Sequence, residues 1–223
     1  MTATVVGATG LIGSHLLQAL LEDAYFDTIR ILIRRPIDIT HIRLEKKIVD
    51  FNDGDSLLVA LSNSEVLFCA IGTTQKKVKG DKDAYRKIDF DIPVKLARFC
   101  KMTGCEKFIL ASSAGANSKS MNFYQRLKGE TEEAVKEVGP KTIHIMRPSL
   151  LLGDRKEFRL VENIGKVVMT TLSFLIPDKY KAIQAKAVAK VMLALAKKNE
   201  DGYFIHGNSE IIHLSNNLNE ELH

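Results

Sequence analysis

The chain of 223 residues lacks tryptophan, has only three cysteines and five prolines, and contains no long apolar run. Three cysteines cannot form an even disulfide framework. Cys100 and Cys105 have no neighbouring histidine or further cysteine to complete a zinc-type site, so we expect no metal. Cys69 stands in an apolar, strand-like run and is expected to be a small core residue. Free thiols indicate a reducing compartment, and we predict a cytoplasmic protein.

No apolar run reaches the ~18 to 20 residues that cross a bilayer, so we expect no membrane segment. The most apolar helical stretch, 167–176, contains two threonines and a serine and predicts a packed helix. The chain begins at once with strand-like residues, which argues against a secretory signal. The net charge of +5 includes a denser basic stretch at 76–87 and suits an anionic cofactor. No helix-turn-helix, zinc spacing or aromatic-basic patch indicates nucleic acid as a partner.

Strand-like and helical patterns alternate along the whole chain, and its 45% hydrophobic residues suffice for one full core. Strands are expected at 2–6, 28–33, 47–50, 65–71, 106–112 and 141–146. Helices are expected at 11–23, 54–62, 83–103, 121–138, 159–176 and 184–198. Nearly continuous apolar strands such as 66–71 indicate a parallel sheet with helices on both faces. The sequence therefore predicts an α/β, doubly wound Rossmann sheet in a single domain over 1–223.

Two local features modify this scheme. Pro93 lies inside the long helical region 83–103 and is expected to break or kink it near Ile92. After Pro148 the spacing changes, and we expect two helices and a strand pair at 202–206 and 210–213. These elements would form a small C-terminal lobe on the substrate side, over roughly 148–223.

A glycine-rich turn follows the first strand and leads into an apolar helical pattern. Strand, glycine turn and helix together are the context that makes such a motif a dinucleotide site. Glycines let the backbone turn tightly beside the pyrophosphate, and the helix N-terminus offers free N–H groups and partial positive charge. The alternative is an ordinary strand-to-helix turn. The candidate contacts are Gly7, Thr9, Gly10, Leu11, Ile12 and Gly13.

The second strand ends in Arg34 and Arg35, at the position where an acid reads the ribose of NAD, roughly 20 residues past the glycines. An acid would bond the 2′-hydroxyl and repel a 2′-phosphate, whereas a guanidinium binds the phosphate by charge-assisted hydrogen bonds. The sequence therefore favours NADP over NAD. The alternative is that both arginines are a solvated strand end.

The ends of the other strands supply the remaining cofactor candidates, because ligands of such sheets bind beyond the carboxyl ends of the strands. Asp50 and Phe51 could flank an adenine, with helix capping near Asp53 and core packing as the alternatives. Pro148 fixes a turn after the sixth strand, so nearby backbone such as Leu150 could face the nicotinamide, or form a plain turn. The small residues after the fourth strand admit a ribose: Ala70, Ile71, Gly72 and Thr73.

Ser113, Tyr124 and Lys128 form the candidate catalytic set. Tyr124 and Lys128 are four residues apart on an expected helix and share one face. A free tyrosine is a poor base at neutral pH, but a nearby ammonium and a positive nicotinamide favour its phenolate. Tyr124 would move the proton, Lys128 would hold the ribose, and Ser113 would bond the reacting oxygen. Ser112 is the alternative serine, and the Tyr-Lys spacing also occurs by chance on amphipathic helices.

These motifs resemble the extended and atypical short-chain dehydrogenase/reductases over nearly the whole chain. Segments 69–74, 112–117, 123–130 and 147–153 are similar to the group of Tat-interacting-protein oxidoreductases and their bacterial relatives. The resemblance implies a Rossmann fold, bound NADP(H) and an oxidoreductase-type site, but no particular substrate. It also implies that the helices at 83–103 and 121–138 could pair in a homodimer. The short connection from Ser113 to Tyr124 and the short chain after Pro148 count against a bulky sugar-nucleotide substrate.

We therefore expect an NADP(H)-dependent oxidoreductase that acts on a small carbonyl or alcohol. One alternative is an NADP(H)-binding sensor or regulatory interaction protein without significant turnover. The other is an epimerase or isomerase that uses the same cofactor. The intact Tyr124 and Lys128 favour an enzyme.

Overall fold

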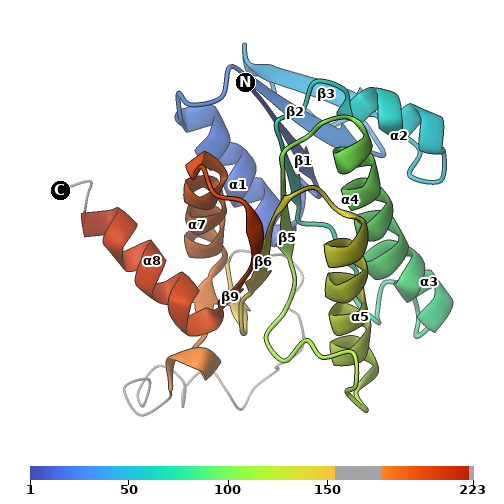
Figure 1. Cartoon of the computed structure of the whole chain (residues 1–223), viewed down its shortest axis with the longest axis vertical. Helices are drawn as coiled ribbons and strands as arrows, with labels where there is room; N and C mark the ends of the chain where they lie inside the picture. The colour runs from blue at the N-terminus through green and yellow to red at the C-terminus, as the bar shows by residue number, and fades with distance from the viewer. Residues whose placement is uncertain (154–176, 221–223) are drawn as a thin grey trace.

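The computed structural model describes residues 1–153 and 177–220. Its centre is a seven-stranded sheet in the order β3-β2-β1-β4-β5-β6-β9, with every neighbouring pair parallel (Figure 1). The strands are β1 (Thr2–Val6), β2 (Thr28–Ile33), β3 (Leu44–Ile48), β4 (Val66–Cys69), β5 (Lys107–Ala111), β6 (Thr142–Arg147) and β9 (Gly202–Gly207). The strand order reverses between β1 and β4, so the predicted doubly wound Rossmann sheet is confirmed.

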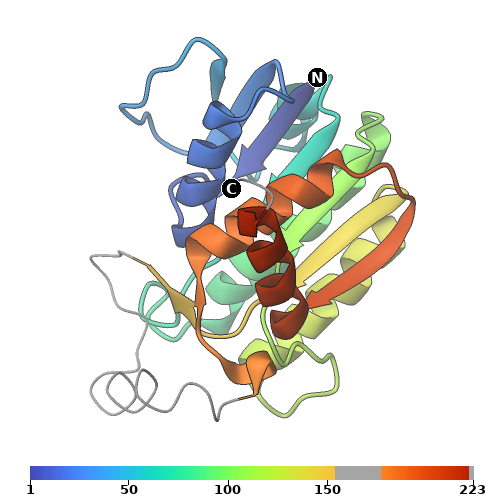
Figure 2. The ribbon, with the colours of Figure 1, turned by 90° about the vertical axis from the view of Figure 1, so that its left-hand side faces the viewer.

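Helices cover both faces of the sheet (Figures 1 and 2). One face carries α1 (Leu11–Glu22), α7 (Ala185–Lys197) and α8 (Asn208–Glu220). The other carries α2 (Gly54–Leu61), α4 (Ile92–Met102) and α5 (Phe123–Val138). Successive strand residues point to opposite faces, so Val5 belongs to the core under α1 and α7 while Val6 belongs to the core under α2 and α4. The sheet therefore separates two hydrophobic cores, and buried Cys69 lies in the second, as predicted.

The helical region around Pro93 changes its winding along its length. It consists of α3 (Lys82–Arg86), a π-helical turn η1 (Lys87–Asp91) and α4, which has Pro93 in its first turn. Proline lacks an N–H group and is tolerated at the start of an α-helix. The predicted interruption near Ile92 is therefore present as a change from π to α winding, without a break in the helical path.

Two expected strands need correction. The strand expected at 47–50 is β3, which spans Leu44–Ile48; all five of its residues are partly or fully exposed and three of them are charged, so no apolar run marks its bounds. The segment 210–213 is not a strand but part of α8, because Ile211 and Ser215 repeat at helical spacing and are buried. The strand expected at 202–206 is present as β9, which extends the main sheet beside β6. The helix expected at 159–176, with its apolar stretch 167–176, lies outside the described residues.

A second, two-stranded sheet and one asparagine join the chain segments on either side of residues 154–176. The strands are β7 (Leu151–Leu152) and β8 (Ile183–Gln184), which pair in parallel. Buried Asn208 accepts a hydrogen bond from Ser149 N–H at 2.8 Å. Its Nδ2 donates to the carbonyl oxygens of Asp178 at 2.6 Å and Lys181 at 2.9 Å. The first turn of α8 therefore holds the end of β6 beside the returning chain.

A buried histidine pair joins the last two strands of the sheet to α8. His144 Nδ1 lies 3.0 Å from His206 Nε2, and His206 Nδ1 lies 2.8 Å from a carboxylate oxygen of Glu210. Within the described part of the chain, Nε2 of His144 has no hydrogen-bond partner. Burial, and then the nearby charges of His206, Lys107 and Lys198, lower the pKa of His144 to about 4. His144 is therefore neutral in the folded protein at neutral pH.

This depressed pKa predicts a loss of stability in mild acid. The unfolded chain protonates His144 near pH ~6.5 and the folded chain near pH 4, so between these values the unfolded state binds more protons. The free energy of unfolding should fall by up to about 3 kcal/mol through this window. Urea denaturation between pH 7 and 4 measures it. His144→Gln should flatten this part of the profile, whereas exposed His213→Gln should not; an unchanged slope in His144→Gln would contradict the assignment.

Candidate functional site

The residues predicted to form the site come together because all strands of the main sheet are parallel. Gly7 follows β1, Ala70 follows β4, Ser112 and Ser113 follow β5, and Pro148 follows β6. The carboxyl ends of parallel strands share one edge of the sheet, and the chain reversal between β1 and β4 opens that edge for a ligand. The candidate site therefore lies at the edge where ligands of such sheets bind.

The glycine turn after β1 is packed too tightly for side chains. Gly7 has φ +89°, and a Cβ there would lie 2.6 Å from the carbonyl carbon and oxygen of Ala70. A Cβ at Gly13 would lie 2.0 Å from the carbonyl oxygen of Gly7. Gly10 N–H donates to that same oxygen at 2.8 Å and closes the turn. These glycines therefore bring β1, β4 and α1 into direct backbone contact.

The N-terminus of α1 is suited to an anion. Its N-cap is Gly10, no side chain caps it, and its first turn contains no acidic residue. The first N–H groups of a helix lack intrahelical partners and carry partial positive charge. Thr9 is exposed beside them, whereas Ile12 is buried and could offer only its backbone. The turn thus has the donors that a pyrophosphate requires.

Arg34 and Arg35 follow β2, next to β1 in the sheet, and both side chains are exposed. Asp50 is exposed too, and its carboxylate accepts from the backbone and side-chain N–H groups of Asn52, each at 2.9 Å. Phe51 is buried among the core residues under α2 and α4. Its ring thus packs in the core, which was the alternative to an adenine contact. The helix cap nearby is Asp53, which caps α2.

Helix α5 carries Tyr124, Lys128 and Glu132 at intervals of four residues, and Lys128 and Glu132 are among its buried residues. Lys128 is buried, and its Nζ lies 2.8 Å from Asp89 Oδ1 and 6.0 Å from the centroid of the Tyr124 ring. The Tyr85 ring meets the Tyr124 ring edge-on, with centroids 6.4 Å apart. Burial acts to lower the pKa of Lys128, but Asp89 and Tyr124 outweigh it and raise the pKa well above its usual value. Lys128 is therefore charged at neutral pH.

Asp89 is a site residue that sequence reasoning missed. It lies in the π-helical turn, is 1% exposed, and accepts the backbone N–H of Thr73 at 2.8 Å as well as pairing with Lys128. The sequence signal is an acidic residue placed between Tyr85 and Leu96 on the apolar side of a helical region. A buried acid requires a partner, and an acid on an apolar face therefore points to a buried cation.

A second ion pair joins half-buried Arg147, at the end of β6, to buried Glu132 on α5. Arg147 Nε lies 3.1 Å from both carboxylate oxygens of Glu132, and its Nη2 also donates to Glu132. The hydrogen bond to Glu132 raises the pKa of Arg147 further. The Ser112 hydroxyl donates to the same carboxylate, whereas the Ser113 hydroxyl contacts only the Ala114 carbonyl, at 3.3 Å, among described residues. Ser112 is thus engaged in the interior, and Ser113 is the better candidate for a substrate contact.

The loops after β5 and β6 are tied to each other. Ala114 N–H donates to the Pro148 carbonyl at 2.8 Å. The Leu150 carbonyl accepts from Ile183 N–H at 2.9 Å, so this part of the predicted nicotinamide contact is used in the second sheet. Pro148 is buried and Leu150 is half-buried.

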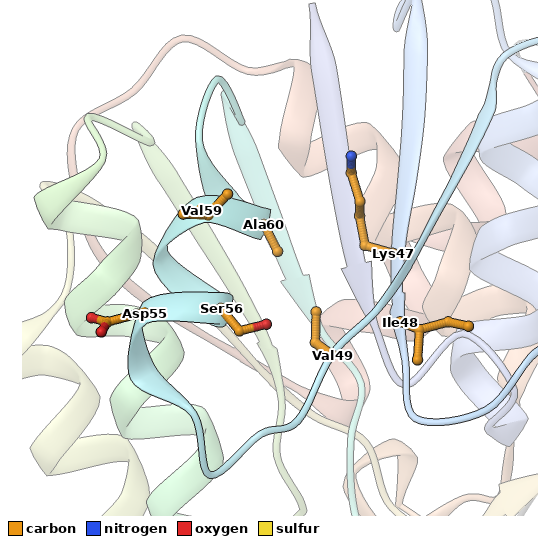
Figure 3. A pocket seen from close by; sticks show the side chains of 7 residues that line it. All are labelled: Lys47, Ile48, Val49, Asp55, Ser56, Val59 and Ala60. Atoms are coloured by element: carbon orange, nitrogen blue, oxygen red, sulfur yellow. The ribbon is translucent and has the colours of Figure 1, made fainter.

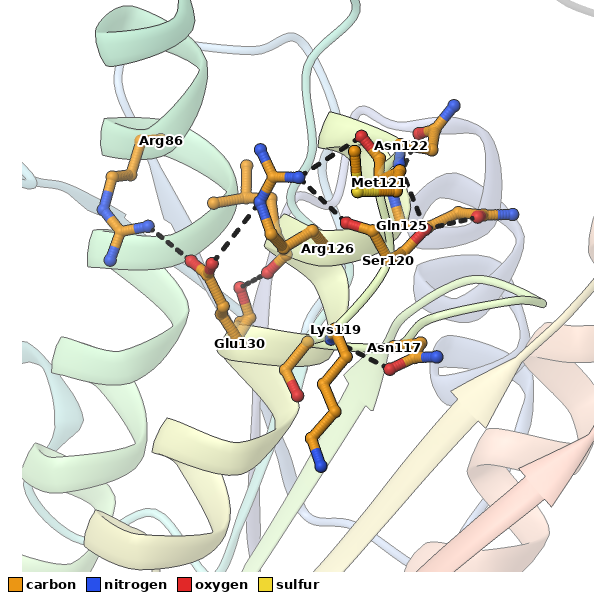
Figure 4. A network of polar contacts seen from close by, with 12 residues as sticks. Arg86, Asn117, Lys119, Ser120, Met121, Asn122, Gln125, Arg126 and Glu130 are labelled. Atoms are coloured by element: carbon orange, nitrogen blue, oxygen red, sulfur yellow. Dashed lines mark hydrogen bonds and ion pairs between the residues drawn. The ribbon is translucent and has the colours of Figure 1, made fainter.

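A polar network holds the connection between Ser113 and Tyr124 against α5 (Figure 4). Arg126 donates to the Ser120 carbonyl at 2.9 Å, and the Ser120 hydroxyl donates to Gln125 Oε1 at 2.9 Å. Glu130 joins this network to α3, because its carboxylate lies 2.7 Å from Arg86. The connection is thus compact and fixed, as its short length predicts.

The structure also has a surface pocket of about 390 Å³ at the outer edge of the sheet, between β3 and α2 (Figure 3). Its lining residues are Lys47, Ile48, Val49, Asp55, Ser56, Val59 and Ala60. None of the candidate cofactor or catalytic residues belongs to this lining, so the pocket is separate from the site.

The chain belongs to the NAD(P)H-binding family, whose model matches residues 7–199. The protein "FMP52, mitochondrial" of Candida glabrata is 34% identical over 228 residues, which cover 97% of each chain. HTATIP2 of Rattus norvegicus is 31% identical over 194 residues, which cover 86% of this chain and 78% of its own. The match to HTATIP2 confirms the resemblance to the Tat-interacting-protein group.

Solved structures share the fold. MoeE5 in complex with UDP-glucuronic acid and NAD has a TM-score of 0.73 and 17% identity, covering 99% of this chain and 83% of MoeE5. At this identity the likeness establishes the fold alone.

The relatives correct the predicted compartment. The Candida glabrata protein is named mitochondrial, as are further relatives of the same name, and this contradicts the prediction of a cytoplasmic protein. Cysteine usage reports the redox state of a compartment and does not identify the compartment.

The described residues contain no group of three or more metal-ligating side chains, and none of their helices is long and apolar enough to span a bilayer.

The close packing of α5 against the preceding loop yields a stability prediction. A Cβ at Gly129 would lie 2.1 Å from Ser118 N and 2.3 Å from the Asn117 carbonyl carbon. Gly129→Ala should therefore lower the free energy of unfolding by about 1–3 kcal/mol, although alanine favours a helix. Gly207→Ala is the control, since its Cβ would meet nothing within 4 Å. Chemical denaturation compares them, and equal stability of both variants would refute the packing argument.

Proposed function

We propose that this chain is an NADP(H)-dependent oxidoreductase that interconverts a small carbonyl compound and its alcohol. The observation that supports this most is that the Nζ of buried Lys128 lies 6.0 Å from the centroid of the Tyr124 ring and that Lys128 faces the Cys69 thiol at the end of β4. The N-terminus of α1, which no side chain caps, and the turn at Gly7 and Gly13, where a Cβ would meet backbone atoms, fit a dinucleotide. When bound, the cofactor supplies the hydride donor or acceptor.

The roles of the chain's own residues follow from their surroundings. Tyr124 gives its hydroxyl proton to the carbonyl oxygen in reduction and takes the proton of the alcohol in oxidation. Lys128 holds the ribose by hydrogen bonds, and Ser113 donates a hydrogen bond to the reacting oxygen. The Ser112 hydroxyl donates to Glu132, which is paired with Arg147, so the Ser113 hydroxyl is the one that would contact the substrate. The small residues 70–72 border the ribose.

Two alternatives follow from specific observations. The UDP-glucose 4-epimerase of Thermus thermophilus, solved in complex with NAD, shares the fold, so an epimerase or isomerase reaction on the same cofactor is a second candidate. The compact, network-bound connection from Ser113 to Tyr124 favours a smaller substrate. A cofactor-binding regulator without turnover has the same binding residues, and the turnover test below distinguishes it. We place the protein in mitochondria, as the name of its relative FMP52 states for that protein.

Arg34 provides the test of cofactor choice. If its guanidinium binds the 2′-phosphate, Arg34→Ala should weaken NADPH binding by about tenfold to a hundredfold and leave NADH binding nearly unchanged. Arg98→Ala, an exposed arginine on α4, should change neither affinity. Calorimetric titration with both cofactors measures this. Equal losses for NADPH and NADH would remove Arg34 from the phosphate site.

Tyr124 provides the test of catalysis. Tyr124→Phe should lower the turnover of aldehydes and ketones with NADPH by roughly 10²–10⁴, because the proton donor is lost while the ring remains. NADPH affinity should be retained. Tyr25→Phe, which removes a hydroxyl from the loop before β2, serves as the control. Full activity of Tyr124→Phe would refute its role, and a wild type that binds NADPH but reduces nothing would support the regulator.

A further inference from the structure

The cation at the centre of the proposed site has a dedicated counter-charge. Lys128 and Asp89 have side chains 8% and 1% exposed, and their charged atoms lie 2.8 Å apart. Other groups that face Lys128 are the phenols of Tyr124 on α5 and Tyr85 on α3, and the Cys69 thiol on β4. Burial raises the pKa of the Cys69 thiol to about 12, so that group is neutral. The buried pair is therefore balanced, with one positive and one negative charge.

The chain fixes Asp89 from several directions. The carboxylate lies in the π-helical turn Lys87–Asp91, and such turns are rare in proteins and are frequent at functional sites. Its second oxygen accepts the Thr73 N–H at 2.8 Å, and Tyr85 donates its hydroxyl to the Thr73 carbonyl at 3.1 Å. Asp89 therefore connects the loop after β4, which belongs to the proposed cofactor site, to the lysine on α5.

We infer that Asp89 is a positioning residue that sets the relative affinity of the site for oxidised and reduced cofactor, by cancelling the charge of Lys128. This inference rests on the proposed function. The nicotinamide ring is cationic when oxidised and neutral when reduced, so a charge beside it acts on one form only. In a buried site, where charges are weakly screened, an unbalanced ammonium would repel the oxidised form. With Asp89 in place, the pair exerts little net force on either form.

The inference predicts shifts of opposite sign for the two partners. Asp89→Asn leaves Lys128 unbalanced, so NADP⁺ affinity should fall relative to NADPH affinity on the order of tenfold. Lys128→Met leaves Asp89 unbalanced and should favour NADP⁺ relative to NADPH, although both bind more weakly once the ribose contact is lost. The double variant Asp89→Asn/Lys128→Met should return toward the wild-type ratio. Asp91→Asn, an exposed acid of the same π turn, should leave the ratio unchanged.

The experiment is calorimetric titration of the full chain and its variants with NADPH and with NADP⁺, with thermal unfolding as the check on folding. A general structural defect weakens both forms and leaves their ratio unchanged, so the ratio isolates the charge effect. If Asp89→Asn does not fold, the test is the ratio of NADP⁺ to NADPH affinity in Lys128→Met, which should shift in the opposite direction. Ratios that stay constant in the folded variants overturn the inference while the proposed function stands. A wild type that binds neither form overturns both.

Discussion

Two ion pairs on one face of α5, one fully buried and one partly exposed, determine how the site is assembled. Lys128 pairs with Asp89, and Glu132 pairs with Arg147 one turn further along the helix. An uncompensated charge inside a protein destabilises it by several kcal/mol. Separating the two members of a pair is therefore unfavourable. These pairs therefore fix α5 relative to the π-helical turn and to the end of β6. The position of Tyr124 beside Tyr85 and Lys128 follows from these constraints.

The fold could be predicted from the sequence where burial left a periodic signal. The apolar strands and amphipathic helices of the interior appear at the expected places, because a parallel sheet buries both faces. Prediction failed at the edges. The strand β3 has only one neighbour in the sheet and carries charged side chains, and the apolar spacing of α8 is visible only over several turns. Local pattern is weakest where tertiary contacts are fewest.

The candidate site was predictable in its contacts with the backbone and less so in its side-chain pairs. The glycine turn follows from sterics at Gly7 and Gly13, which a sequence motif encodes directly. The choice between Ser112 and Ser113 depends on Glu132, and the surroundings of Lys128 depend on Asp89, both of which are distant in sequence. The three-dimensional structure is needed to show which acidic side chain pairs with which basic one. The spacing of Tyr124 and Lys128 could be read from the sequence, whereas the charge balance around them could not.

The asparagine at the start of α8 has a consequence for how this fold diversifies. Asn208 holds Ser149 beside Asp178 and Lys181, so the points where the chain leaves the sheet and returns to it are fixed close together. A segment between two fixed points can lengthen at little cost, because the entropy of closing a loop grows slowly with its length. The pairing of β6 with β9 is insulated from those changes. The fold can therefore acquire new chain by insertion between Ser149 and Asp178 while the sheet keeps its geometry.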